Sequence, residues 1–128
     1  MVIAIIGILS SIVLVSMGSA RRSARDATRK ADMRQIINAQ EMYYGENETY
    51  FTDDGTVWPT AIGTYMSSTP LDPTNSGSYI YVWVDNTPNA EKFCVYATLE
   101  AGGYYTASNA GHFSCSDAAP ILDDCCLP

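Results

Sequence analysis

The feature that constrains this chain most is its first stretch, the apolar run MVIAIIGILSSIVLVSMG from Met1 to Gly18, which holds no charged residue. A polar, helix-favouring stretch follows it directly and reaches Tyr44. One helix over both stretches would be about 66 Å long at about 1.5 Å per residue, too long to lie along a domain made from the rest of the chain. One half must therefore project. A projecting helix that is apolar on all sides needs lipid or other helices around it.

The formal net charge of −7 conceals an asymmetry between the two parts of the chain. Residues 1–40 carry a charge of +4, and residues 41–128 carry a charge of −11. The acidic balance argues against a nucleic-acid-binding domain, so no specific nucleic-acid partner is expected. The split predicts that basic residues of the stem pair with acids, within the stem or on the head of another copy. Six of the seven basic residues belong to this set: Arg21, Arg22, Arg25, Arg29, Lys30 and Arg34.

Apolar periodicity predicts a stem helix over residues 1–44, in which 1–18 is a membrane anchor or filament core and 19–44 is amphipathic. Gly45 is expected to stop this helix. Residues at steps of three and four form one stripe in the amphipathic half, small at first and large later. The large end is expected to pack on the head, and the alanine end to allow close approach of another helix. The stripe comprises Ala20, Ala24, Ala27, Ala31, Met33, Ile36, Ile37, Gln40, Tyr43 and Tyr44.

Residues 45–128 are expected to form the globular head, which makes the fold class α+β. Turn-forming residues dominate 45–78, with one short helix around Thr60–Met66. An antiparallel sheet is predicted over 79–107, because turn signals separate its aromatic and β-branched runs. The tail, 108–128, is expected to be mostly irregular. The three predicted strands are Tyr79–Val84, Glu91–Leu99 and Tyr104–Ala107.

Four cysteines lie in the last 35 residues: Cys94, Cys115, Cys125 and Cys126. An even number in a small domain predicts disulfides and an oxidising compartment. Of the three connectivities, one closes a strained ring between neighbours. The other two tie Cys94 to one of the terminal pair and Cys115 to the other. We prefer these two because each fastens the tail to the sheet. The single histidine, His112, is expected in an exposed turn, and zinc is disfavoured because no Cys-x-x-Cys pair is present.

The first 44 residues resemble a known family. The run VIAIIGILSSIVLVSM followed by ARRSARDATRKADMRQIINAQEMYY is similar to the N-terminal helix of type IV pilins and type II secretion pseudopilins. YMSSTPLDP, at Tyr65–Pro73, resembles the loop before the first strand of their head. The resemblance implies that the apolar half anchors the subunit in the inner membrane and later forms the core of a helical filament. The residues given this role are Val2, Ile3, Ala4, Ile5, Ile6, Gly7, Ile8, Leu9, Ile12, Val13, Leu14, Val15 and Met17.

The sequence departs from the family pattern at its start. The family has a basic leader, a peptidase cut, a methylated first residue and a glutamate four residues after it, and none of these stands in this sequence. Val2–Gly7 matches the residues that come directly after that glutamate in the family. We therefore expect that about seven mature residues are missing, through truncation or a misassigned start codon.

The resemblance implies a structural pilin that polymerises into a type IV pilus, with copies of itself, the inner membrane and the pilus assembly machinery as partners. Its place would be the bacterial cell surface, in an extracellular filament. Alternatives are a major pseudopilin of a type II secretion system, or a minor pilin or tip adhesin that binds a ligand through Ser108–Pro128. Motility, adhesion, DNA uptake and secretion all use such subunits.

No catalytic constellation is recognisable, so no enzyme is expected. The adjacent acids Asp53-Asp54 and Asp123-Asp124 are typical of solvated turns. A weak calcium candidate has oxygen ligands of the right type and would echo the calcium loop of some pseudopilins, although its spacing matches no defined pattern. It consists of Asp85, Asn86, Asn89 and Glu91. No other metal or cofactor is expected.

Overall fold

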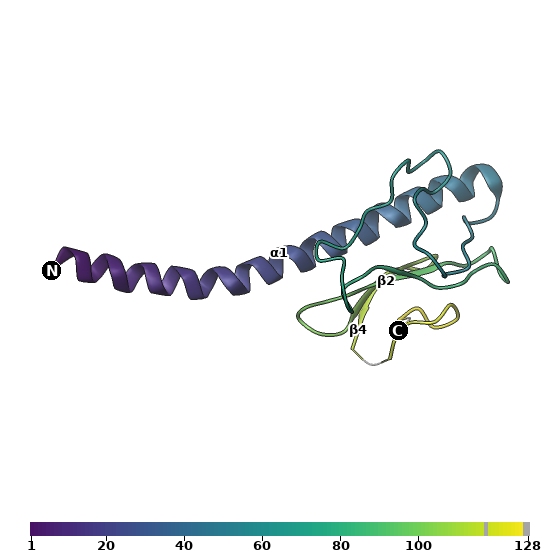
Figure 1. The fold of residues 1–128 in the computed structure, drawn as a ribbon. Coiled ribbons are helices and arrows are strands. Elements are labelled where there is room, and N and C mark those ends of the chain that lie inside the picture. The colour runs from purple at the N-terminus through teal and green to yellow at the C-terminus, as the bar shows by residue number, and fades with distance from the viewer. Residues whose placement is uncertain (117, 127–128) are drawn as a thin grey trace.

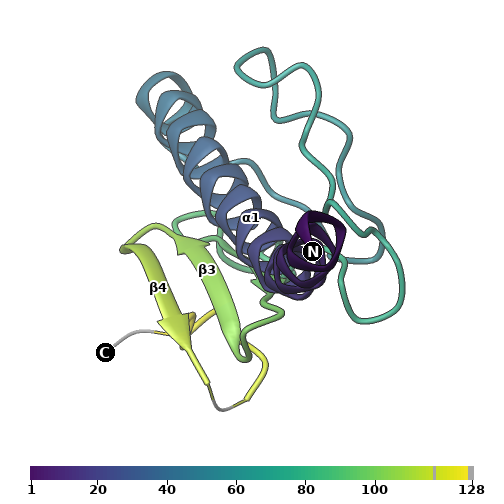
Figure 2. The same cartoon turned by 90° about the vertical axis from the view of Figure 1, so that its left-hand side faces the viewer.

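The computed structural model describes residues 1–116 and 118–126. One helix, α1 (Val2–Asn47), carries a small head along its second half, while its first half projects alone (Figure 1). The head contains one antiparallel sheet in the order β1-β2-β3-β4. Figure 2 shows the sheet on one side of α1 and the loops that precede β1 on the other. The strands are β1 (Val82–Trp83), β2 (Cys94–Thr98), β3 (Tyr104–Ser108) and β4 (Gly111–Cys115). The α+β class and the antiparallel meander predicted from the sequence are confirmed.

The end of α1 lies beyond the predicted stop. Gly45 is inside the helix, and Glu48 caps it in the left-handed conformation (φ 58°), with its N–H donating to the Tyr44 carbonyl at 2.8 Å. Packing explains the difference, because the Tyr50 ring lies 4.7 Å from the Tyr44 ring and holds the last turn in place. A glycine in a helix costs only about 1 kcal/mol, which such contacts offset.

The buried face of α1 follows the predicted stripe only from Met33 onwards, where the helix packs on the apolar core. Met33, Ile36 and Gln40 are fully buried, as the periodicity indicates. Towards the stem the buried face continues through Arg29 and Asp26, because the head presents acids and turn amides there instead of an apolar surface. The small residues of the stripe are exposed and leave the other side of the helix open: Ala20, Ala24, Ala27 and Ala31.

The core lies between α1 and the sheet, and it is largely aromatic. Phe93 is fully buried against Tyr50, with ring centroids 4.8 Å apart, and Trp83 packs edge-on against Phe51 at 5.8 Å. Gln40 joins the helix to the following loop, since its amide donates to the Phe51 carbonyl at 3.2 Å and accepts from the Phe51 N–H at 2.8 Å. The upper half of α1 is therefore an integral part of the head.

Three local predictions differ from the structure. β1 covers only two residues of Tyr79–Val84, and Thr60–Met66 forms a turn closed by an Ile62–Met66 bridge instead of a helix. The tail is not mostly irregular, because β4 pairs with β3 and extends the sheet past the predicted limit at residue 107. His112 accordingly lies on β4 and not in a turn. The β3–β4 hairpin is tight, and Gly111 (φ 123°) supplies a backbone conformation that other residues rarely adopt.

Disulfides fasten the tail to two different strands. Cys94 on β2 is bonded to Cys125, and Cys115 on β4 to Cys126, with Cα atoms 5.8 and 5.5 Å apart. One of the two preferred connectivities is confirmed, and the Cys125–Cys126 ring is not formed. Cys94 and Cys125 are buried, whereas the second bond is half-buried. The neighbouring cysteines Cys125 and Cys126 thus hold β2 and β4 from one point of the tail.

We expect the two bonds to differ in their effect on stability. The Cys94–Cys125 bond spans 31 residues and the Cys115–Cys126 bond spans 11. Chain-entropy arguments give about 4 kcal/mol for the longer loop and about 3 kcal/mol for the shorter one. C94A/C125A should therefore lower the free energy of unfolding more than C115A/C126A in urea titrations. Peptide mapping without reductant checks the pairing, and a Cys94–Cys115 linkage would contradict it.

Candidate assembly interface

The projecting half of α1 has nothing packed on it. Its most apolar window of 18 residues has a mean hydropathy of 2.4 and no buried residue. By length and composition this helix can cross a membrane, since its apolar run is close to the lower limit for a bilayer span of about 17 residues. All the residues predicted as anchor or filament core lie here on one continuous helix, and all are exposed. The region therefore requires lipid or other helices.

The backbone of this region is satisfied within the helix, as lipid requires. Ser10 Oγ donates to the Ile6 carbonyl at 2.8 Å, and Ser11 Oγ donates to the Gly7 carbonyl at 3.0 Å. These bonds satisfy the hydroxyl protons within the helix, although such back-bonding also weakens and bends helices. A Cβ on Gly7 or Gly18 would meet nothing within 4 Å, so neither glycine is required by contacts of the chain itself. Small residues of this kind let neighbouring helices approach closely.

Five charged side chains lock the head to α1 where the projecting half begins. We call Arg25, Asp26, Arg29, Asp72 and Glu100 the neck cluster. Arg29 is fully buried and binds Asp72 through two hydrogen bonds, Nε–Oδ2 at 2.7 Å and Nη2–Oδ1 at 3.0 Å. Its Nη1 also donates to Asp26 at 2.7 Å and to Glu100 at 3.0 Å. Arg25 holds Glu100 through two further bonds, both at 2.7 Å.

The carboxylates of the neck cluster also organise two loops of the head. Asp26 accepts the N–H groups of Glu100 and Ala101 at 2.9 and 3.0 Å, which fixes the β2–β3 turn against the helix. Asp72 accepts the Thr74 N–H at 2.8 Å and so shapes the loop before β1. One turn of α1 therefore fixes two head segments that are far apart in the sequence. The head cannot tilt on the stem without breaking buried charge-assisted bonds.

Ionisation in this region follows the contacts. The hydrogen bond between Glu100 and Arg25 lowers the pKa of Glu100 to about 2, and the hydrogen bond from Arg29 acts in the same direction. The hydrogen bond to Asp72 raises the pKa of Arg29. On the same helix, burial raises the pKa of Asp32, against a hydrogen bond from the Tyr81 hydroxyl at 2.6 Å. Glu100 therefore stays ionised in the folded chain under all ordinary conditions.

We expect the neck cluster to make folding acid-sensitive. Because the pKa of Glu100 is lower in the folded chain than its ordinary 4.5, its contribution is complete above that pH and is lost as the pH falls towards about 2. Asp32 acts in the opposite direction, since its raised pKa favours the folded state at low pH. Urea titrations at about pH 6 and about pH 2.5 should show a loss of stability that is smaller in E100Q. An E100Q chain with the wild-type pH dependence would contradict this assignment.

The calcium candidates have other partners in the structure. Asn86 is fully buried, and its carboxamide oxygen accepts from the Asp53 N–H at 2.9 Å and the Trp83 indole at 3.0 Å. Asp85 accepts from both the N–H and the hydroxyl of Thr87. Asn89 accepts the N–H of Glu91. Within residues 1–116 and 118–126, no three His, Cys, Asp or Glu side chains gather as a metal site. These residues build a loop through their own hydrogen bonds.

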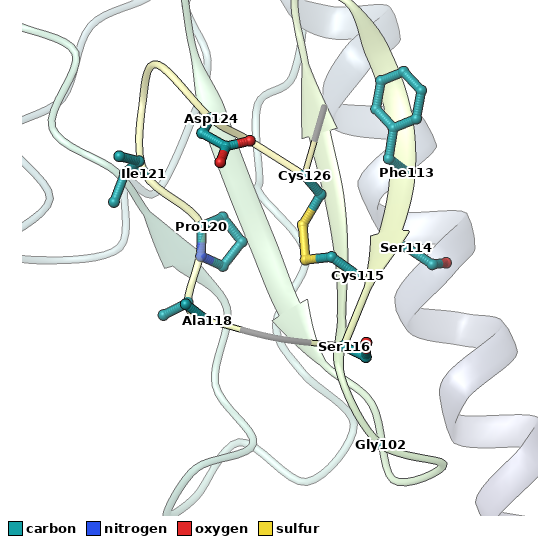
Figure 3. A pocket seen from close by; sticks show the side chains of 11 residues that line it. Gly102, Phe113, Ser114, Cys115, Ser116, Ala118, Pro120, Ile121, Asp124 and Cys126 are labelled. Carbon is teal, nitrogen blue, oxygen red and sulfur yellow. A yellow bond between two sulfur atoms is a disulfide. The ribbon is translucent and has the colours of Figure 1, made fainter. Parts of the chain in front are cut away.

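A pocket of about 740 Å³ lies between β4 and the tail, where the sequence placed a candidate ligand-binding loop. Figure 3 shows Pro120 and Ile121 on the tail loop, across from the Cys115–Cys126 disulfide. Asp124 supplies the carboxylate among the described lining residues. The pocket is open and mixed in polarity, and its lining indicates no particular ligand chemistry.

The class of protein is defined by the fold: a long N-terminal helix with an apolar projecting half, a small antiparallel sheet on its other half, and C-terminal disulfides. This arrangement is a pilin-like α+β fold. Comparisons of the chain with models of known families, with curated proteins and with solved structures find no match.

Proposed function

We propose that this chain is a structural filament subunit of the type IV pilin kind, which polymerises through its apolar N-terminal helix. One observation carries the proposal: the exposed apolar residues Val2–Met17 continue, as the same helix, into a head that is locked to it. A free helix of this kind could serve as a simple anchor. A rigid connection to a compact head also transmits the position of the stem to the head, as an ordered filament needs.

The proposed cycle has two stages, and in both the apolar stem is surrounded by apolar groups. The stem first lies in the inner membrane, where its backbone bonds are internally satisfied. On assembly it exchanges lipid for the stems of other copies, and the heads form the outside of a surface filament. The pilus assembly machinery would drive this transfer. The role is structural, and we propose no reaction catalysed by the chain.

A major pseudopilin of a type II secretion system would use the same residues in the same way. A minor pilin or tip adhesin is favoured by one observation, the pocket between β4 and the tail. Abundance separates these functions, because a major subunit forms the bulk of the filament and a tip subunit is rare in it.

Assembly of the purified full-length chain tests the proposal. The chain is purified in a mild detergent, the detergent is removed by dialysis, and the product is pelleted and imaged by electron microscopy. We expect regular filaments in which this chain is the main component. Amorphous aggregate, or insertion into added vesicles without any filament, would contradict the proposal.

We further predict that α1 is interrupted in the filament between Gly7 and Gly18. The two glycines each cost about 1 kcal/mol in a helix, and the serine back-bonds weaken the same segment. In the isolated chain the helix is continuous there. A filament reconstruction that resolves the backbone is the measurement. Unbroken helical hydrogen bonds from Val2 to Ala31 would refute the prediction, and G7A/G18A should restore continuity where it is lost.

A further inference from the structure

The basic residues of the stem divide into two sets in the structure. Arg25 and Arg29 bind acids of their own head, and Lys30 lies over the Tyr105 ring, with Nζ 5.7 Å from the ring centroid. Arg21, Arg22 and Arg34 are exposed and take part in no ion pair formed by residues 1–116 and 118–126. Arg34 lies on the part of α1 that carries the head, whereas Arg21 and Arg22 lie on the stem side of the neck cluster. We call these two the basal arginines.

The basal arginines lie on α1 directly before the neck cluster. Arg22 precedes Asp26 by four residues, so it lies on the same side of α1 as the neck cluster, one turn closer to the stem. The four-residue spacing of Arg22 and Asp26 suits an ion pair, but Asp26 binds Arg29 instead. The positive charge of the basal arginines therefore remains available to a partner on the stem side of the head.

Unpaired negative charge gathers at the opposite end of the head. The loops at residues 53–56 and 85–87 are joined by backbone and side-chain bonds, with Asn86 N–H donating to the Asp53 carbonyl at 3.2 Å. Asp53, Asp54 and Asp85 accept hydrogen bonds from N–H groups of their own turns, but the ion pairs of the described residues do not include them. We call these three residues the acidic loops.

The two surfaces are far apart along one axis. The acidic loops lie next to Phe51, which is bound to Gln40 of α1. Gln40 follows Arg21 by 19 residues, a distance of about 28 Å along the helix. The two opposite charges within one copy therefore cannot meet. They can meet between parallel copies shifted along the axis, which is a head-to-tail contact that repeats without closing.

We propose that the basal arginines of one copy dock on the acidic loops of a second copy, which lies parallel to it and is offset by about 28 Å along α1. This inference rests on the proposed function and names its axial contact. Charge complementarity selects a second copy as the occupant, because residues 41–128 carry −11 and the acidic loops have no cation of their own among the described ion pairs. The phosphates of anionic lipids are the competing partner for arginines close to the apolar run.

Neutral variants test the contact without disturbing the turns. D53N/D54N keeps the acceptor oxygens of both turns. D123N/D124N is the control on the tail, where it also removes the exposed Lys92–Asp123 ion pair. At about 50 mM salt we expect R21Q/R22Q and D53N/D54N each to raise the critical concentration for assembly about tenfold. The D123N/D124N control should change the critical concentration less than about twofold. A chain that carries both R21Q/R22Q and D53N/D54N should have a critical concentration little higher than that of either double variant. If the arginines serve lipid instead, R21Q/R22Q alone weakens membrane binding and D53N/D54N assembles like the control, which overturns the inference.

A zero-length carbodiimide cross-link tests the geometry directly. In full-length R22K filaments we expect an amide bond between position 22 and a carboxylate of the acidic loops of another copy, found by mass spectrometry. Mixing isotopically light and heavy chains shows whether the bond joins two copies. Filaments without this link contradict the inference while the proposed function stands. A wild-type chain that forms no filaments contradicts both.

Discussion

Deleting Met1–Gly18 is expected to abolish assembly and leave a soluble, monomeric head. The deleted residues contribute no buried side chain, whereas the neck cluster begins at Arg25 and the apolar core begins at Met33. The remaining part of α1 keeps every contact that it makes with the sheet. Sedimentation equilibrium should give the mass of one chain, and circular dichroism should show a folded protein.

A milder variant separates loss of the apolar surface from loss of length. I8D/I12D keeps the helix but places two charges in its middle, where each costs about 3 kcal/mol in a bilayer. We expect it to lose membrane association and assembly like the deletion. A conservative I8L/I12L control should assemble normally. Filaments formed by the truncated head would show that the stem is not the assembly element.

Replacing Arg29 by methionine is expected to destabilise the head by about 3 to 5 kcal/mol. The substitution keeps much of the side-chain volume but leaves Asp26 and Asp72 buried without their cation. Removing one partner of a buried pair is costly for this reason, while removing both is much less so. Urea unfolding of the full chain in a non-denaturing detergent is the measurement.

Matched variants distinguish buried charge from a general effect of removing an arginine. R34M lies on the exposed side of the same helix and should change the free energy of unfolding by less than about 0.5 kcal/mol. R29M/D72N should be less destabilised than R29M alone, because one uncompensated carboxylate is gone. An R29M chain as stable as R34M would show that the neck cluster does not hold the head on the stem.

Elements governed by local pattern could be predicted from the sequence. The apolar run from Val2 to Met17 has no partner within reach, so its exposure follows from composition and helix length. The aromatic, β-branched runs separated by turn residues indicated the meander, with strand ends displaced by a few residues. The position of four cysteines near a sheet favoured two of the three possible disulfide arrangements, and one of these two is present.

The neck cluster could not be predicted, because its members meet only through the tertiary fold. Asp72 and Glu100 lie 43 and 71 residues from Arg29, and nothing local singles them out among fourteen acids. The one local indication was that Asp26 and Arg29 are three residues apart and can pair on one helix face. Pairs at this spacing also occur on fully exposed helices, so the spacing does not predict a buried cluster. β4 was missed for a similar reason: its residues have weak strand preference, and pairing with β3 decides their conformation.

The most direct test of the account is a helical reconstruction by electron microscopy of filaments assembled from the full-length chain. We predict stems packed together in the core with Val2–Met17 inside, heads on the outside, and each neck cluster intact. Filaments held together through their heads, with the stems outside the core, would contradict the account.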